Sequence, residues 1–101
     1  MANNLKDQYL DELFKAVLSL KNVDECYRFF EDLLTVNEIK SMAQRLAVAR
    51  LLSEGRTYEE ISSKTGASTA TISRVKKFLE YGSDGYRLVL NRSQEPRAKS
   101  Q

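Results

Sequence analysis

The chain of 101 residues contains no histidine, one cysteine, one proline and four glycines. Without histidine, and with a single cysteine, it lacks the side chains most often used for general acid–base or nucleophilic catalysis. It also contains no glycine-rich phosphate loop and no ligand spacing typical of a metal site. These absences argue against an enzyme, and we expect neither a cofactor nor a metal.

The single cysteine, the single proline and the lack of long apolar runs also restrict the fold and the cellular compartment. Cys26 has no partner for a disulfide within one chain, which is compatible with the reducing cytoplasm. No apolar run approaches the roughly 18 residues of a membrane span, and no signal-peptide pattern follows Met1. Pro96 lies near the C-terminus, and no segment alternates in polarity as a strand does. We therefore expect a cytoplasmic, all-α protein that makes no membrane contact, with a single domain over residues 1–92.

The first half of the chain has the apolar spacing of amphipathic helices over residues 7–20, 22–34 and 35–54. Asn22 and Thr35 each precede a glutamate by three residues, a capping pattern that marks helix starts. In the second half of the third helix, apolar residues from Leu46 to Leu52 cover most of the circumference, and only Arg50 interrupts them. This part of the helix therefore needs neighbours on several sides. We expect residues 5–54 of two copies to pack into a homodimer. A monomer with a central helix is the alternative.

Residues 57–79 have the pattern of a helix-turn-helix. Thr57 and Glu60 form a capping box at the start of the first helix. Gly66 supplies the left-handed conformation that a tight helix exit requires. Ser68 can then cap the second helix by accepting a backbone hydrogen bond.

The contact between these two helices is predicted from the same segment. Ile61 and Ser62 on the first helix have the spacing to meet Ile72 and Val75 on the second. Ser62 is short enough to allow close approach.

A short amphipathic helix is expected over residues 84–92. The polar residues 93–101 are expected to be a disordered tail.

Positive charge is concentrated in the second half of the chain. Residues 1–54 contain seven lysines or arginines and nine acidic residues, a net charge of −2. Residues 55–101 contain nine and five, a net charge of +4. A surface that faces phosphates requires this excess of cations, so the distribution supports DNA binding by the second half.

The run LLTVNEIKSMAQRLAVARLLSEGRTYEEISSKTGASTATISR resembles the tryptophan repressor family, and within it the small bacterial regulators of the YerC/YecD type. The most specific matches are Leu34-Thr35, Gln44-Arg45, Thr65-Gly66-Ala67 and the segment 70–74. The resemblance implies a bundle of about six helices with a helix-turn-helix, assembled as an intertwined homodimer. It also implies binding to double-stranded operator DNA and the action of a transcriptional repressor.

The DNA-contacting segment of that family corresponds here to residues with mostly short side chains. The candidate DNA-binding residues are Thr57, Tyr58, Ser68, Thr69, Ala70, Thr71, Ser73, Arg74 and Lys77. Short side chains can approach base edges or hold bridging waters, and only Arg74 could make a bidentate contact with guanine. Glu59 stands where the family has a basic residue. Together with Glu60 it should repel phosphates, so we expect a modest and strongly salt-dependent affinity.

The resemblance also suggests an effector site, because the family binds tryptophan between two arginines beside a carbonyl and a hydroxyl. The corresponding candidate residues are Leu34, Thr35, Arg45 and Arg74. Val75 and Phe78 replace a glycine and a serine of the family, and Asp32 replaces an apolar residue. The added bulk of Val75 and Phe78 argues against a tryptophan corepressor. The sequence leaves open whether another small effector binds.

Two functions are compatible with these patterns. The first is a sequence-specific DNA-binding regulator that acts as a homodimer without tryptophan. The alternative is a helix-turn-helix module that binds another macromolecule and does not recognise a DNA sequence. The acidic first helix and the short side chains of the second are compatible with that alternative.

Overall fold

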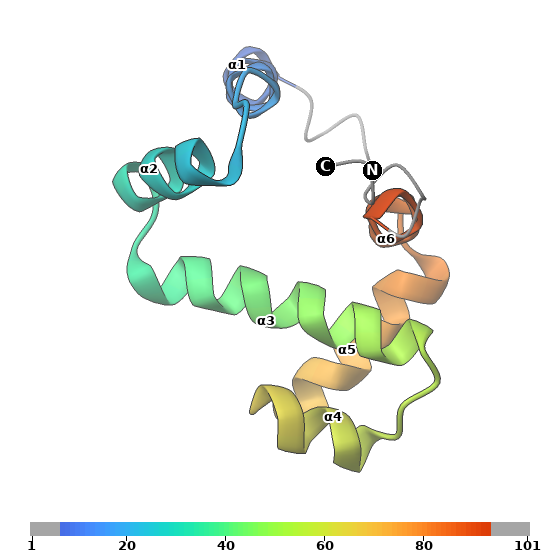
Figure 1. Cartoon of the computed structure of the whole chain (residues 1–101). Coiled ribbons are helices and arrows are strands. Elements are labelled where there is room, and N and C mark those ends of the chain that lie inside the picture. Colours follow the sequence, from blue (N-terminus) through green and yellow to red (C-terminus); the bar gives the residue numbers. More distant parts are fainter. Residues whose placement is uncertain (1–6, 94–101) are drawn as a thin grey trace. The chain divides into compact units, whose positions relative to one another are not determined.

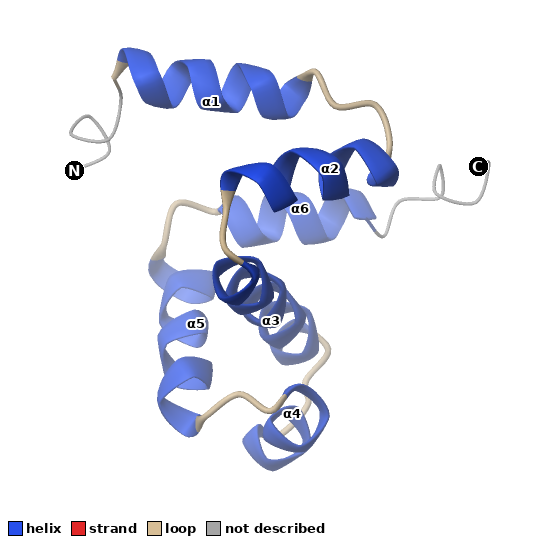
Figure 2. Cartoon of the chain, turned by 90° about the vertical axis from the view of Figure 1, so that its left-hand side faces the viewer, coloured by secondary structure: helices blue, strands red, loops and turns tan. Residues whose placement is uncertain are grey.

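The computed structural model describes residues 7–93, which contain six α-helices and no strand (Figures 1 and 2). The helices are α1 (Gln8–Leu18), α2 (Val23–Leu33), α3 (Val36–Ser53), α4 (Tyr58–Thr65), α5 (Thr69–Tyr81) and α6 (Gly85–Ser93). The prediction of an all-α fold with about six helices is confirmed. The predicted tail lies outside the described residues, except for Ser93, which ends α6. Within residues 7–93, no helix is both long and apolar enough to cross a bilayer.

Side-chain caps fix the starts of the first three helices. The Asp7 carboxylate accepts a hydrogen bond from the backbone of α1, and the Asn22 side chain accepts one from the Glu25 amide at 2.9 Å. Thr35 and Glu38 form the predicted reciprocal pair, in which the Thr35 amide donates to the Glu38 carboxylate at 2.9 Å. Each such cap contributes about 0.5–2 kcal/mol. The capping patterns of the sequence therefore place the starts of α2 and α3 correctly.

The chain divides between Ile39 and Lys40 into two compact units. In the first unit, neither α1 nor α2 contains a buried residue. Large apolar side chains are instead exposed to solvent; they are Tyr9, Phe14, Leu18, Val23, Tyr27, Leu33 and Val36. Leu18 is 82% exposed and Tyr27 is 64% exposed. Side chains this exposed gain little hydrophobic stabilisation within one chain.

The second unit contains the core, to which four helices contribute. Its buried residues are Val48, Ala49, Leu51, Ile61, Ala67, Ile72, Val75 and Leu90. In Figure 1 the second half of α3 crosses α5 and lies beside α4, while α6 follows the end of α5. This arrangement gives the apolar second half of α3 neighbours on more than one side, as its composition requires.

The connection from α5 to α6 depends on a backbone contact. The Gly82 amide donates to the Phe78 carbonyl at 2.9 Å, and a β-carbon at Gly82 would collide with that same carbonyl. The Arg87 side chain then donates from Nε to the Leu79 carbonyl at 2.8 Å. These bonds satisfy carbonyl groups at the end of α5 and attach α6 to it.

Candidate nucleic-acid interface

Helix α4 ends in a tight exit that directs the chain into α5. Gly66 has a φ of +75°, and its amide donates to the Ser62 carbonyl at 2.8 Å. A glycine adopts this left-handed conformation without steric penalty. The Thr65 hydroxyl donates to the Ile61 carbonyl at 2.7 Å and accepts from the Ala67 amide at 3.1 Å. Backbone and side-chain bonds together therefore define the turn.

Both helices begin with the caps that the sequence indicates. At the start of α4, the Glu60 amide donates to the Thr57 hydroxyl at 3.1 Å, and the Thr57 amide donates to the Glu60 carboxylate at 2.9 Å. At the start of α5, the Ser68 hydroxyl accepts from the Thr71 amide at 3.1 Å. The start of each helix is thus fixed by hydrogen bonds between its cap residue and its own first turn.

The contact between α4 and α5 is apolar and fully buried. Ile61 and Ile72 are 0% exposed, and Val75 is 1% exposed. The prediction that Ser62 takes part in this core is wrong, because Ser62 is exposed. Successive residues of a helix are about 100° apart around its axis, so the side chain that follows the buried Ile61 points away from α5. The small residue in the core is Ala67 in the turn, which is 2% exposed.

Tyr58 joins the first turn of α4 to the exposed side of α5. Its phenol oxygen accepts a hydrogen bond from the Ser73 hydroxyl at 3.5 Å. The Lys76 ammonium lies 6.0 Å from the centre of the Tyr58 ring, at the outer limit of a cation–π contact. Sequence spacing could not reveal either contact, because the partners come from different helices.

The predicted DNA-binding residues all lie on α4, on α5 or at their caps. The exposed members are Thr57, Ser68, Thr69, Ala70, Ser73, Arg74 and Lys77, whereas Tyr58 and Thr71 are half-buried. The set is therefore accessible within the second unit. Its contact with DNA stays a prediction.

The charges of the two helices differ in sign near this surface. Helix α5 exposes Arg74, Lys76 and Lys77 and has no acidic residue in its first turn. Helix α4 carries Glu59 and Glu60 in its first turn, where the helix dipole stabilises negative charge. Phosphates would be attracted to α5 and repelled by the start of α4. Such a balance makes binding sensitive to salt.

The capping box makes the stability of α4 dependent on pH. The hydrogen bond from the Thr57 amide lowers the pKa of the Glu60 carboxyl, and the charge of Arg56 also lowers it, while partial desolvation raises it. A lowered folded-state pKa stabilises the fold above the ordinary glutamate value of about 4.3. That contribution is lost as the pH falls through the folded-state pKa.

The variant Glu60→Gln removes this titrating group and should therefore lose stability less steeply as the pH falls. Acid unfolding followed by circular dichroism measures the difference. Identical acid unfolding curves for the variant and the parent would contradict this role of Glu60.

The four candidate effector residues are divided between the two units. Leu34 and Thr35 belong to the first unit, whereas Arg45 and Arg74 are exposed residues of the second. The Thr35 hydroxyl already donates to the Glu38 carboxylate at 3.1 Å and accepts from the Glu38 amide at 3.2 Å. This hydroxyl therefore serves the start of α3. The effector site stays a prediction.

Val75 and Phe78 have different surroundings although both are on α5. Val75 belongs to the buried core between α4 and α5. Phe78 is 52% exposed and lines an apolar groove of about 540 Å³. The other residues of the groove are Leu46, Ser83, Gly85, Tyr86 and Val89. Val75 therefore holds the helix pair together, and Phe78 adds apolar surface.

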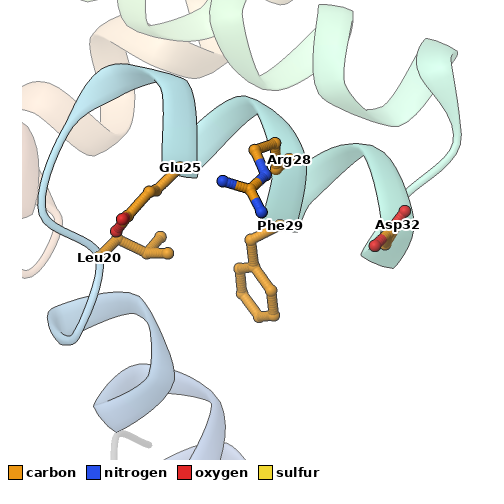
Figure 3. Close-up of a pocket in the computed structure, with 5 residues that line it drawn as sticks. All are labelled: Leu20, Glu25, Arg28, Phe29 and Asp32. Carbon is orange, nitrogen blue, oxygen red and sulfur yellow. The ribbon is translucent and has the colours of Figure 1, made fainter.

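Asp32 lies at one end of a shallow hollow of about 300 Å³ on α2 (Figure 3). The hollow is lined by Leu20, Glu25, Arg28, Phe29 and Asp32. The Glu25 carboxylate accepts from the Lys21 amide at 2.9 Å, and the Arg28 guanidinium lies 3.8 Å from the Asp24 carboxylate. Glu25 and Arg28, two charged residues of the hollow, therefore already have partners within the chain. We assign no ligand to this hollow.

Gln44 is a positioning residue that sequence reasoning missed. Its side-chain amide donates to the Thr65 carbonyl at 3.1 Å, which connects α3 to the end of α4. The bond satisfies a terminal carbonyl that has no partner within its own helix. The pair Gln44-Arg45 stood out in the family resemblance, but no sequence pattern indicated the partner of Gln44.

Comparison with known proteins agrees with this geometry. Residues 8–94 match the family model described as Trp repressor protein. The chain is 57% identical over 98 residues to the uncharacterised protein YerC of Bacillus subtilis (strain 168), covering 97% of this chain and 94% of that protein. A crystal structure of a TrpR-like protein from Eubacterium eligens ATCC 27750 is 59% identical, with a TM-score of 0.87 over 89% of this chain and 93% of that one. A proposed Trp repressor from Staphylococcus aureus is 54% identical, with a TM-score of 0.86 over 89% of this chain and 90% of that one. The predicted resemblance is confirmed, and the chain belongs to the Trp repressor family, which indicates a DNA-binding regulator.

Proposed function

We propose that this protein is a sequence-specific DNA-binding transcriptional repressor that acts as a homodimer and does not require tryptophan. The observation that carries the proposal is the pair α4 and α5, two capped helices joined by a tight turn and a buried apolar contact. Such a pair is a helix-turn-helix in which the second helix enters the major groove. The proposal assigns that position to α5.

The exposed residues of α5 support this assignment. Ser68, Thr69 and Ala70 at its start are exposed and have short side chains, so the helix can approach base edges closely. Arg74, one turn further along, is long enough to contact either a guanine or a phosphate. Cations on the same helix would neutralise phosphates, and their contribution would weaken as salt increases.

The exposed apolar residues of the first unit support a homodimer. Phe14 is 57% exposed and Leu18 is 82% exposed, one helical turn apart on α1. Surfaces of this kind usually mark an interaction site. A second copy provides the same apolar residues, so a two-fold assembly can cover both surfaces at once. It would also supply two recognition helices for DNA half-sites roughly 34 Å apart.

Tryptophan independence follows from Val75. In the proposed mechanism, its buried side chain holds α5 against α4, so no ligand is needed to stiffen that contact. We expect calorimetric titration with tryptophan to give no binding at micromolar concentrations, and operator affinity to be equal with and without tryptophan. Micromolar affinity for tryptophan, or operator binding that requires it, would contradict this part of the proposal.

Selection of binding sites from random duplex DNA tests the proposed function directly. A repressor dimer is expected to select a palindromic consensus with half-sites separated by about one helical turn. Uniformly weak binding that disappears at moderate salt would contradict sequence recognition. That result would favour the interaction module, whose surface would include the acidic first turn of α4.

A further inference from the structure

The two neighbouring acids at the start of α4 differ in their structural roles. The Glu60 carboxylate is part of the capping box, 2.9 Å from the Thr57 amide. The Glu59 side chain is exposed, and within residues 7–93 no hydrogen bond or ion pair engages its carboxylate. The nearby cation Arg56 instead lies 3.9 Å from Glu54. Helix capping therefore explains Glu60, whereas Glu59 has only the favourable interaction of its charge with the helix dipole.

Glu59 lies in the same helical turn as Tyr58, the residue of α4 that contacts the exposed side of α5. It follows Tyr58, whose phenol oxygen lies 3.5 Å from the Ser73 hydroxyl on the exposed side of α5. It precedes the buried Ile61 by two residues, a rotation of about 200°, so its side chain points away from the core. Glu59 is thus an exposed residue of the first turn of α4, next in sequence to the tyrosine that contacts Ser73 on α5.

A carboxylate in this place can interact with DNA in few ways. It accepts hydrogen bonds and donates none, and phosphates repel it. In the major groove only the exocyclic amines of cytosine and adenine donate, while guanine and thymine present acceptors. Adenine carries the acceptor N7 beside its amine, whereas cytosine presents its amine without an adjacent acceptor. Cytosine is therefore the base edge that a carboxylate favours.

We infer that Glu59 determines specificity by accepting a hydrogen bond from the N4 amine of a cytosine in each operator half-site. This inference rests on the proposed function and adds a base preference to it. The carboxylate disfavours other bases at that position and also lowers affinity for nonspecific DNA. Glutamine in its place keeps the shape of the side chain but adds a donor, which suits the N6 and N7 pair of adenine.

The test compares the parent with Glu59→Gln and Glu59→Ala by binding-site selection. Affinities are then measured on four duplexes that differ only at the position with the altered preference. The parent is expected to favour cytosine by about tenfold, equivalent to about 1.4 kcal/mol. Glu59→Gln should shift the preference to adenine, and Glu59→Ala should abolish it. As a control, Glu12→Gln removes the same charge from an exposed position of α1 and should leave every preference unchanged.

Two negative results are distinguishable. If both Glu59 variants bind every duplex more tightly by the same factor and select the parental consensus, Glu59 only repels phosphates and the inference is wrong. If the parent itself selects no consensus, sequence-specific DNA binding is contradicted, and the inference, which depends on it, is contradicted as well.

Discussion

Replacing Leu18 by glutamate is expected to dissociate the homodimer and to weaken operator binding by at least about 100-fold. Leu18 is 82% exposed in the single chain, so the substitution removes little of the packing within it. In the proposed dimer the same position is covered by the second copy, and burying an unpaired carboxylate there costs several kcal/mol. Each monomer would then hold one half-site alone and lose the gain from bivalent binding.

Gln8→Glu provides the matched control for this prediction. It adds the same negative charge to the same helix, at an exposed polar position opposite the apolar face of α1. Mass measurements and operator titrations on this control should match the parent, while circular dichroism should show that Leu18→Glu remains helical. A Leu18→Glu variant that keeps the parental mass and operator affinity would contradict the assignment of α1 to the interface.

The second large effect is expected from Ile72→Ala, which should lower the free energy of unfolding of the second unit by about 2–5 kcal/mol. Ile72 is completely buried, together with Ile61 and Val75, where α5 meets α4. The substitution removes three carbon atoms from this contact and leaves a cavity that the two short helices can fill only by moving. Denaturant unfolding and amide exchange in α4 and α5 would measure the loss.

Ile72→Val gives a graded comparison at the same site. It removes one methylene group and should cost about 0.5–1.5 kcal/mol, with DNA binding retained at low temperature. Thr69→Ala changes an exposed residue of the same helix and should leave stability nearly unchanged. Equal destabilisation by Ile72→Ala and Thr69→Ala would show that the helix contact is not maintained by this core.

Local sequence patterns predicted much of the fold because helix ends depend on residues close together in the chain. The capping box of Thr57 and Glu60, the cap at Ser68 and the left-handed Gly66 all involve partners within four residues. Apolar periodicity likewise located α1 to α3 within one or two residues at each end. The same periodicity does not determine side-chain contacts, which is why it predicts Ser62 in the contact between the helices, where the structure has Ala67.

Contacts between helices account for what the sequence could not indicate. The bond from Gln44 to the Thr65 carbonyl and the approach of Lys76 to Tyr58 each join residues that are distant in the chain. They depend on how helices cross, which apolar spacing alone does not specify.

Sedimentation equilibrium of the full chain at micromolar concentration is the most direct test of the proposed two-fold assembly. A homodimer would give twice the monomer mass of 11.6 kDa across that range. A helical, cooperatively folded species of 11.6 kDa under the same conditions would contradict it. In that case one chain would present a single recognition helix, and the two-half-site mode of DNA binding would have to be abandoned.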